Sequence, residues 1–299
     1  MGTDSSAQRP SVGVIIAAYN AERSLDLALS SVFHQTVPPD QVVVVDDCSS
    51  DSTVRIAREW LDRLPLRVLS NANNLGVGSS RSRGIAKLDT DYVAVLDADD
   101  IWLPEHLSMT RSHLGPTRIV SPLFQEWNEG KGLGGTFGSA HMRRRAQRAD
   151  DQLSALLREN FVASGSTFPR PLYDAVGGFP PTRFAEDYGL WVKLVVAGAR
   201  VVFLEAPTVL YRRHSGSLSV VTSETEEAKL ESLDQIAELV PARYADDVEH
   251  ARRVARARVL LCREKEEHPA TRRARAVLLW PALRRAPLRQ KLSVLARLR

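Results

Sequence analysis

The sequence has few of the residues that build cross-linked or membrane-spanning proteins. Its only two cysteines, Cys48 and Cys262, stand far apart and outside any CxxC or Cys/His spacing. This argues against both a disulfide framework and a structural zinc site. No apolar run approaches the roughly 18 residues needed to cross a bilayer, and the polar start MGTDSSAQRP lacks the apolar core of a signal peptide. We therefore expect a cytoplasmic protein.

Two common nucleotide-binding motifs are also missing. The first apolar run leads into Ala17-Ala18-Tyr19-Asn20, whereas a nicotinamide enzyme would carry a GxGxxG turn there. The phosphate-loop pattern GxxxxGK[ST] does not occur either. A phosphohydrolase with an aspartyl nucleophile would place its DxD on an early strand, and here that motif begins at Asp97. These three enzyme classes are therefore disfavoured.

Short apolar runs alternate with helix-like stretches in the first half of the chain. We expect strands at residues 12–17, 41–45, 66–69 and 92–96, and helices at residues 21–33, 52–64 and 78–87. The run VVVVDD is β-branched, continuous and ends in acids, which is typical of a strand buried on both faces of a parallel sheet. The alternation predicts an α/β fold.

The second half of the chain divides near residue 220. Residues 121–149 are rich in Gly and Arg and predict an irregular excursion, and a helix that ends near Gly198 follows. From about Glu224 onward the sequence reads as helix throughout. We expect a catalytic domain at residues 1–220 and a C-terminal α-helical extension at residues 221–299.

Acidic residues gather directly after the predicted strands, where open parallel sheets bind their ligands. They are Asp46-Asp47 after one strand and Asp97-Ala98-Asp99-Asp100 after another, and Glu186-Asp187 begins a later helix. Taken alone, each group also fits a helix-capping turn. Together these carboxylates would repel one another without a cation, so we predict a site for Mg²⁺ or Mn²⁺ beside a phosphate-bearing ligand.

An ordered set of motifs resembles family 2 of the glycosyltransferases across residues 11–219. These are VGVIIAAYN, SVFHQT, VVVVDDCSSDST, NNLGVGSSRSRGIA, DYVAVLDADDIWLPEHL, VGGFPP, EDYGLWVKLVVAG and YRRHSGSLS. The resemblance implies a GT-A fold, which is a Rossmann-like, mixed but mostly parallel sheet flanked by helices. It also implies an inverting transfer of a sugar from a nucleotide-diphosphate donor.

The resemblance also assigns expected roles by position. It places Ala17, Ala18 and Tyr19 along the nucleotide base, Asp46 and Asp47 on base and ribose, and Arg81, Asp97 and Ala98 on the nucleotide sugar. It makes Asp99 and His214 metal ligands and Asp187 the catalytic base, with Glu186 beside it. Ala17 stands where the family usually has Pro, and Ser82 where it commonly has Asn.

The expected donor is a nucleotide-diphospho-sugar, with a UDP-sugar favoured, and the acceptor is a saccharide or another hydroxyl compound. The chain has no QxxRW motif, which favours single addition over processive synthesis. The alternative function is a nucleotide-sugar-binding module without catalysis. It is disfavoured because Asp97, Asp99 and Asp187 are all retained.

The last 28 residues carry the basic charge of the chain. Residues 272–299 contain nine Arg or Lys and no acid, so the rest of the chain is acidic on balance. Leu, Val and Trp280 alternate with these Arg residues as in short amphipathic helices. We expect either a helical lid on the catalytic domain or peripheral attachment to an anionic membrane. Nucleic-acid binding is not expected, because Trp280 is the tail's only aromatic residue.

Overall fold

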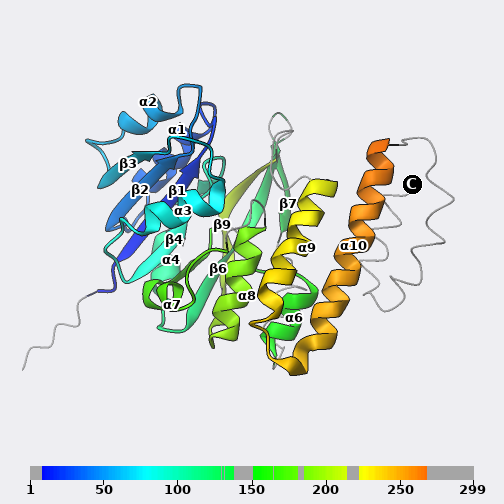
Figure 1. Ribbon diagram of the computed structural model, residues 1–299. Coiled ribbons are helices and arrows are strands. Elements are labelled where there is room, and N and C mark those ends of the chain that lie inside the picture. The colour runs from blue at the N-terminus through cyan, green and yellow to red at the C-terminus, as the bar shows by residue number, and fades with distance from the viewer. Residues whose placement is uncertain are drawn as a thin grey trace, which may run out of the picture.

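The computed structural model describes residues 9–128, 130, 132–137, 151–163, 165–180, 185–213 and 222–267 (Figure 1). The strands are β1 (Val12–Ala18), β2 (Gln41–Asp46), β3 (Leu66–Ser70), β4 (Tyr92–Val95), β5 (Ile101–Trp102), β6 (Arg118–Asn128), β7 (Gly132–Phe137), β8 (Thr167–Pro169) and β9 (Arg200–Arg213). The α-helices are α1 (Leu25–Phe33), α2 (Thr53–Arg58), α3 (Val77–Ile85), α4 (His106–Arg111), α6 (Gln152–Arg158), α7 (Arg170–Ala175), α8 (Glu186–Val196), α9 (Ser223–Ala237) and α10 (Ala245–Glu267), and a 3₁₀ turn, η1, covers Ala242–Tyr244.

One mixed sheet runs through the molecule in the order β3-β2-β1-β4-β8-β6-β9-β5, with β7 paired to β6. Strands β1 to β4 are parallel, as is the β6–β9 pair, whereas β8 runs antiparallel to both β4 and β6. The predicted α/β class is confirmed, and so are the four strands of the first half.

Alternate residues of the central strands enter two different cores. Ile15, Val43 and Val93 pack with helices α3, α6, α8 and α9 on one face of the sheet. Val14 and Val44 pack with α1 and α2 on the other. Both faces are therefore covered, which is why these strands read as continuous apolar runs.

Helix α3 lies unusually close to the sheet at Gly84. A Cβ atom on Gly84 would stand 2.2 Å from Ile15 Cδ1 and 2.8 Å from Val45 Cγ2. Any larger residue would have to displace the side chains of Ile15 and Val45. The first two predicted helices are shorter than expected: residues 22–24 form a turn ahead of α1, and turns follow α2 through residue 63.

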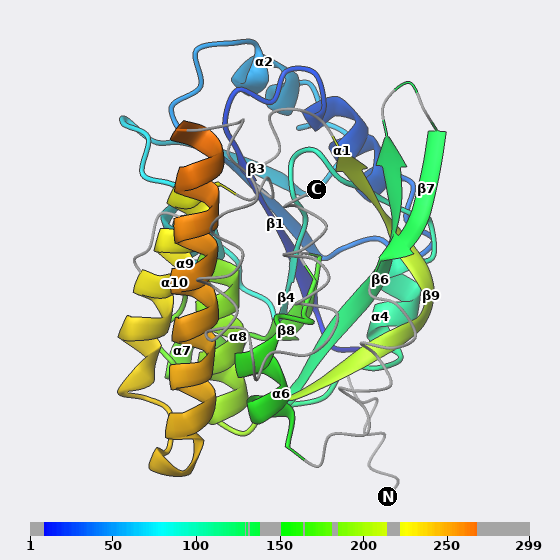
Figure 2. The same cartoon turned by 90° about the vertical axis from the view of Figure 1, so that its right-hand side faces the viewer.

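The C-terminal helices α9 and α10 pack side by side, with α9 against α8 and α10 against α6 (Figures 1 and 2). Leu233 and Ile236 of α9 are buried in the same core as Ile15 of β1. The division into two domains at residue 220 stays a prediction. None of the helices described here is both long and apolar enough to span a bilayer.

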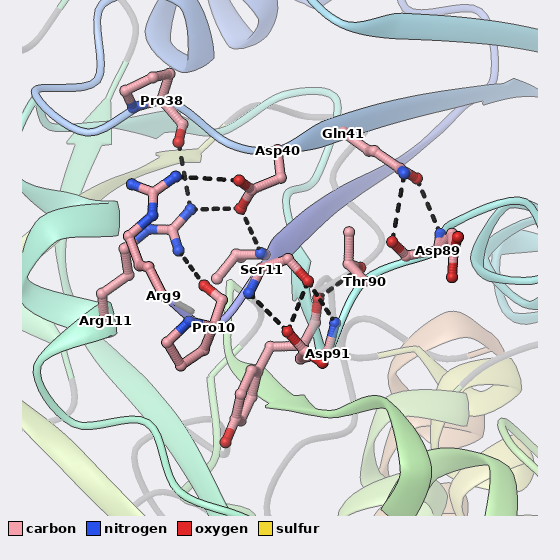
Figure 3. Close-up of polar contacts among 12 residues, drawn as sticks. Arg9, Pro10, Ser11, Pro38, Asp40, Gln41, Asp89, Thr90, Asp91 and Arg111 are labelled. Carbon is pink, nitrogen blue, oxygen red and sulfur yellow. Dashed lines mark hydrogen bonds and ion pairs between the residues drawn. The ribbon is translucent and has the colours of Figure 1, made fainter. Parts of the chain in front are cut away.

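A polar network ties together the amino ends of β1, β2 and β4 (Figure 3). Asp40 accepts hydrogen bonds from Val12 N at 2.7 Å, Arg111 Nη2 at 2.7 Å and Arg9 Nη2 at 3.0 Å. The Ser11 amide and hydroxyl both donate to Asp91 Oδ2 at 2.8 Å. This end of the sheet is thus closed by local pairing, and the acidic motifs lie at the opposite, carboxyl end.

Candidate functional site

The carboxylates of Asp46 and Asp47 organise the loops beyond β2. Both side chains are buried. Asp47 Oδ1 accepts hydrogen bonds from Asn71 Nδ2 at 2.7 Å and Leu75 N at 2.8 Å, and its Oδ2 accepts one from Gly76 N at 2.8 Å. Asp47 therefore fixes the loop between β3 and α3, a structural role that the sequence alone did not reveal.

The loop after β1 is held against the loop after β2 and leaves one aromatic ring outside. Asn20 N donates to Ser49 Oγ at 2.8 Å, and Ser50 N donates to Asn20 Oδ1 at 2.9 Å. Ala17 is half-buried and Ala18 is buried, whereas Tyr19 is 54% exposed. The Tyr19 ring is thus presented at the carboxyl edge of the sheet, where a flat ligand can stack on it.

Arg81 of α3 connects two of the acidic motifs. Its Nη1 donates to Glu186 Oε1 at 2.6 Å, and its Nη2 pairs with Asp97 Oδ1. The residue is only 5% exposed. Burial by itself lowers the pKa of Arg81, but the charges of Asp97, Glu186 and Asp187 outweigh it and raise that pKa. Arg81 is therefore a permanent cation between β4 and α8.

Helix α3 can bring Arg81 close to α8 because two glycines, Gly76 and Gly78, stand at its start. Its N-cap, Gly76, has a φ of +86°, which favours glycine. A Cβ atom on Gly78 would stand 3.0 Å from Glu186 Cβ. The glycines of NNLGVGSSRSRGIA thus set how closely α3 approaches α8 and β1.

The three acids after β4 have different surroundings. Asp97 pairs with Arg81, and Asp99 is half-buried. Asp100 is buried and accepts a hydrogen bond from Arg212 N at 3.0 Å. Burial and then the charges of Asp97 and Asp99 raise the pKa of Asp100 well above its ordinary value. Asp100 therefore joins this turn to β9, which leaves the first two acids as the ligand-facing candidates.

The adjacent acids at the start of α8 also differ from each other. Glu186 is buried and held by Arg81. Burial raises the pKa of Glu186 to about 7, although the charge of Arg81 opposes the shift. Asp187 is half-buried and accepts a hydrogen bond from Tyr188 N at 2.7 Å. Burial also raises the pKa of Asp187 against the opposing charge of Arg81, which moves it towards the range of a general base.

Comparisons with known proteins identify the family of this chain. A sequence model described as "Glycosyl transferase family 2" matches residues 13–145. The amylovoran biosynthesis glycosyltransferase AmsE of Erwinia amylovora is 30% identical over 217 residues, which cover 68% of this chain and 76% of AmsE. This chain belongs to glycosyltransferase family 2. It is accordingly a glycosyltransferase enzyme.

Two solved glycosyltransferase structures share the fold. The 1–349 segment of S. aureus TarS, solved with UDP-GlcNAc, is 18% identical with a TM-score of 0.64, covering 94% of this chain and 82% of that segment. The mannosyltransferase PcManGT of Pyrobaculum calidifontis, solved with GDP-Man and Mn²⁺, is 19% identical with a TM-score of 0.66, covering 98% and 86%. The predicted GT-A fold with C-terminal helices is confirmed.

The predicted metal site of this family 2 enzyme is only partly described. Asp99 lies at the expected strand end, whereas His214 falls outside the described residues. Across the described ranges, no three His, Cys, Asp or Glu side chains are arranged to hold a metal ion. Mg²⁺ is usually held by one or two carboxylates together with substrate phosphates. The half-buried carboxylate of Asp99, at the carboxyl end of the sheet, fits a site in which substrate phosphates supply other ligands.

Proposed function

We propose that this enzyme transfers a sugar, with inversion, from a nucleoside-diphosphate donor to an acceptor hydroxyl, and that Asp187 is its general base. One observation carries this proposal. Arg81 forms an ion pair with the carboxylate of Glu186, whereas the neighbouring Asp187 has no ion pair among the described residues. A carboxylate paired with a cation is the weaker base, because the cation stabilises its ionised form.

On the donor side, the exposed ring of Tyr19 stacks on the base beside Ala17 and Ala18. Asp46, with Asp47 supporting the adjacent loop, faces the base and ribose, and Asp97 and Ala98 face the ribose and sugar. Asp99 holds Mg²⁺ or Mn²⁺, with His214 as the expected second ligand. The neighbouring structures hold UDP-GlcNAc and GDP-Man, and for this chain we favour a UDP-sugar.

The reaction needs one proton transfer and one displacement. Asp187 takes the proton of the acceptor hydroxyl while the hydroxyl oxygen attacks the anomeric carbon. The bond from that carbon to the β-phosphate oxygen breaks, and the nucleoside diphosphate leaves from the opposite face with the bonding electrons. When bound, the divalent ion neutralises charge on the diphosphate. Arg81 keeps Asp97 in position throughout.

The test is a thermal-shift screen of nucleotide sugars with and without Mn²⁺, followed by NMR of the product. A ligand that binds only the folded protein raises its melting temperature. We expect one donor class to do so with metal only, and the product to have the anomeric configuration opposite to that of the donor. A product that retains the donor configuration would exclude the single-displacement mechanism.

The alternative function is a nucleotide-sugar-binding module without catalysis. It predicts the same thermal shifts but no release of nucleoside diphosphate, with any saccharide or other hydroxyl acceptor. The observation that favours catalysis is the half-buried carboxylate of Asp187 at the start of α8, which has no ion pair among the described residues. We place the enzyme in the cytoplasm, with residues 272–299 as the segment that would contact an anionic membrane surface.

A further inference from the structure

Helix α9 contacts α8 at the turn that carries Asp187. Ser232 of α9 is buried, and its Oγ donates a hydrogen bond to Ala185 O at 3.4 Å. A Cβ atom on Gly189 would stand 2.9 Å from the same Oγ, so the two helices touch there because Gly189 has no side chain. Figures 1 and 2 both show α9 alongside α8. The C-terminal helices therefore form one wall of the catalytic region.

Lys229 lies on the inward face of α9. It precedes Ser232 by three residues and Leu233 by four, which is the spacing of neighbours on one helix face, and both of those residues are fully buried. Its Nζ lies 5.5 Å from the ring centroid of Tyr188, the residue that follows Asp187. A half-buried ammonium thus lies beside the catalytic turn.

This ammonium has no partner of opposite charge within the part of the chain that the structure describes. Among the described residues, no carboxylate oxygen lies within 4.0 Å of Lys229 Nζ, which is the limit for an ion pair. No hydrogen bond from Lys229 Nζ is found there either. Glu226, three residues before Lys229 on α9, is paired with Arg258 at 3.4 Å. Burial lowers the pKa of Lys229, Arg258 adds to that effect, and the charges of Glu226, Asp187 and Glu159 oppose it. Burying a charge without a partner is costly unless a ligand supplies the partner.

We propose that Lys229 binds an anionic group, a phosphate or a carboxylate, carried by the acceptor. This inference rests on the proposed role of Asp187 as the base. The donor diphosphate is expected at Asp97 and Asp99, beyond β4, and Arg81 and Glu186 stand between that place and α9. An anion at Lys229 would belong to the acceptor, with its reacting hydroxyl at Asp187. The acceptor class is thus a sugar phosphate or an acidic sugar.

The experiment compares matched acceptors that differ only in charge: a neutral methyl glycoside, its uronic acid and its phosphate ester. The enzymes are wild type, Lys229→Met, Lys229→Arg and, as a control, Lys87→Met at an exposed position. We expect wild type and Lys87→Met to favour an anionic acceptor by about tenfold or more in kcat/KM, as a charge-assisted hydrogen bond would give. In Lys229→Met this preference should disappear through a higher acceptor KM, and Lys229→Arg should restore part of it.

The same preference in Lys229→Met, or none in wild type, would overturn the inference. The uronic acid and phosphate arms show which anion is used. If none of these acceptors reacts, the inference is tested by reductive methylation of the enzyme with UDP and Mg²⁺ bound, in which the rates of modification of Lys229 and Lys87 are compared. Inorganic phosphate should then slow the modification of Lys229 severalfold but not that of Lys87, and equal rates would overturn the inference. Loss of donor binding in wild type would instead count against the proposed function.

Discussion

At the scale of single residues, the two adjacent acids Glu186 and Asp187 differ in their contacts. Glu186 is tied to Arg81, and Asp187 lies next to it on a helix turn where neighbouring side chains diverge by about 100°. Asp187 can therefore face an acceptor hydroxyl while Glu186 keeps its ion pair with Arg81 of α3.

Replacing Asp187 with Asn should lower kcat by about 10² to 10⁴, the usual cost of losing a general base, while donor binding is retained. Glu186→Gln weakens the contact with Arg81 and should mainly raise KM. Steady-state kinetics together with donor titrations measure both effects. A normal kcat in Asp187→Asn, with a loss in Glu186→Gln, would reverse the assignment.

Asp99→Asn tests the metal site. We expect most of the activity and much of the Mn²⁺-dependent thermal shift to be lost, because an amide is a weaker ligand for a hard cation than a carboxylate. Mg²⁺ and Mn²⁺ should both support the wild type. Full turnover by wild type in excess EDTA would contradict the metal requirement.

At the scale of secondary-structure elements, the contact of α3 with β1 depends on Gly84. Gly84→Ala should destabilise the protein by about 1–3 kcal/mol, since the added methyl group meets both Ile15 and Val45. Urea unfolding followed by circular dichroism measures the change. The matched control is Gly135→Ala, because a Cβ atom there meets nothing within 4 Å. Equal stability of the two variants would show that Ile15 and Val45 move aside for the added methyl group without loss of stability.

At the scale of the whole molecule, the network around Asp40 predicts how stability depends on pH. Burial raises the pKa of Asp40, but hydrogen bonds from Arg111 and Val12 and the charges of Arg111 and Arg9 lower it overall. The pKa in the folded state is therefore below that in the unfolded state. Asp40 then stabilises the fold above the unfolded pKa, and this contribution is lost as the pH falls through the folded pKa.

Below about pH 4, the wild type should accordingly lose stability more steeply than Asp40→Asn does. Urea midpoints measured across the acidic range give the two slopes. Asp62→Asn, at an exposed position with no hydrogen bond in the described structure, is the control and should follow the wild type. Parallel curves for wild type and Asp40→Asn would show that the network does not act through this carboxylate.

The basic segment 272–299 lies outside the described residues, so its role stays a prediction. If it binds anionic lipid, each basic residue near the surface adds about 1 kcal/mol, and high salt should release the protein. Liposome co-sedimentation of the full chain and of a form ending at residue 271 compares the two hypotheses. Equal recovery of both forms in the supernatant at low salt would favour the helical lid.

Sequence reasoning predicted the parts of the molecule that local patterns encode. Period and residue type predicted β1, β2 and β4, and the acids after them marked the carboxyl edge of the sheet. The use of Asp47 as a loop anchor was not predictable, because it depends on amides of Leu75 and Gly76 that only the fold brings near. Lys229 was missed for the same reason, since the sequence of α9 does not show that this helix packs against the start of α8.

The bridge through Arg81 has a consequence for how this site can change over time. Asp97 and Glu186 are 89 positions apart in the sequence, yet they share one guanidinium. Replacing one acid leaves the buried Arg81 cation with one carboxylate partner, and replacing both leaves it with neither, so the second replacement costs more than the first. Positions 81, 97 and 186 should therefore be strongly epistatic, and a library that varies them one at a time would find only losses. New donor preferences should come instead from positions outside this triad, such as Tyr19, whose exposed ring can be exchanged without disturbing a buried charge.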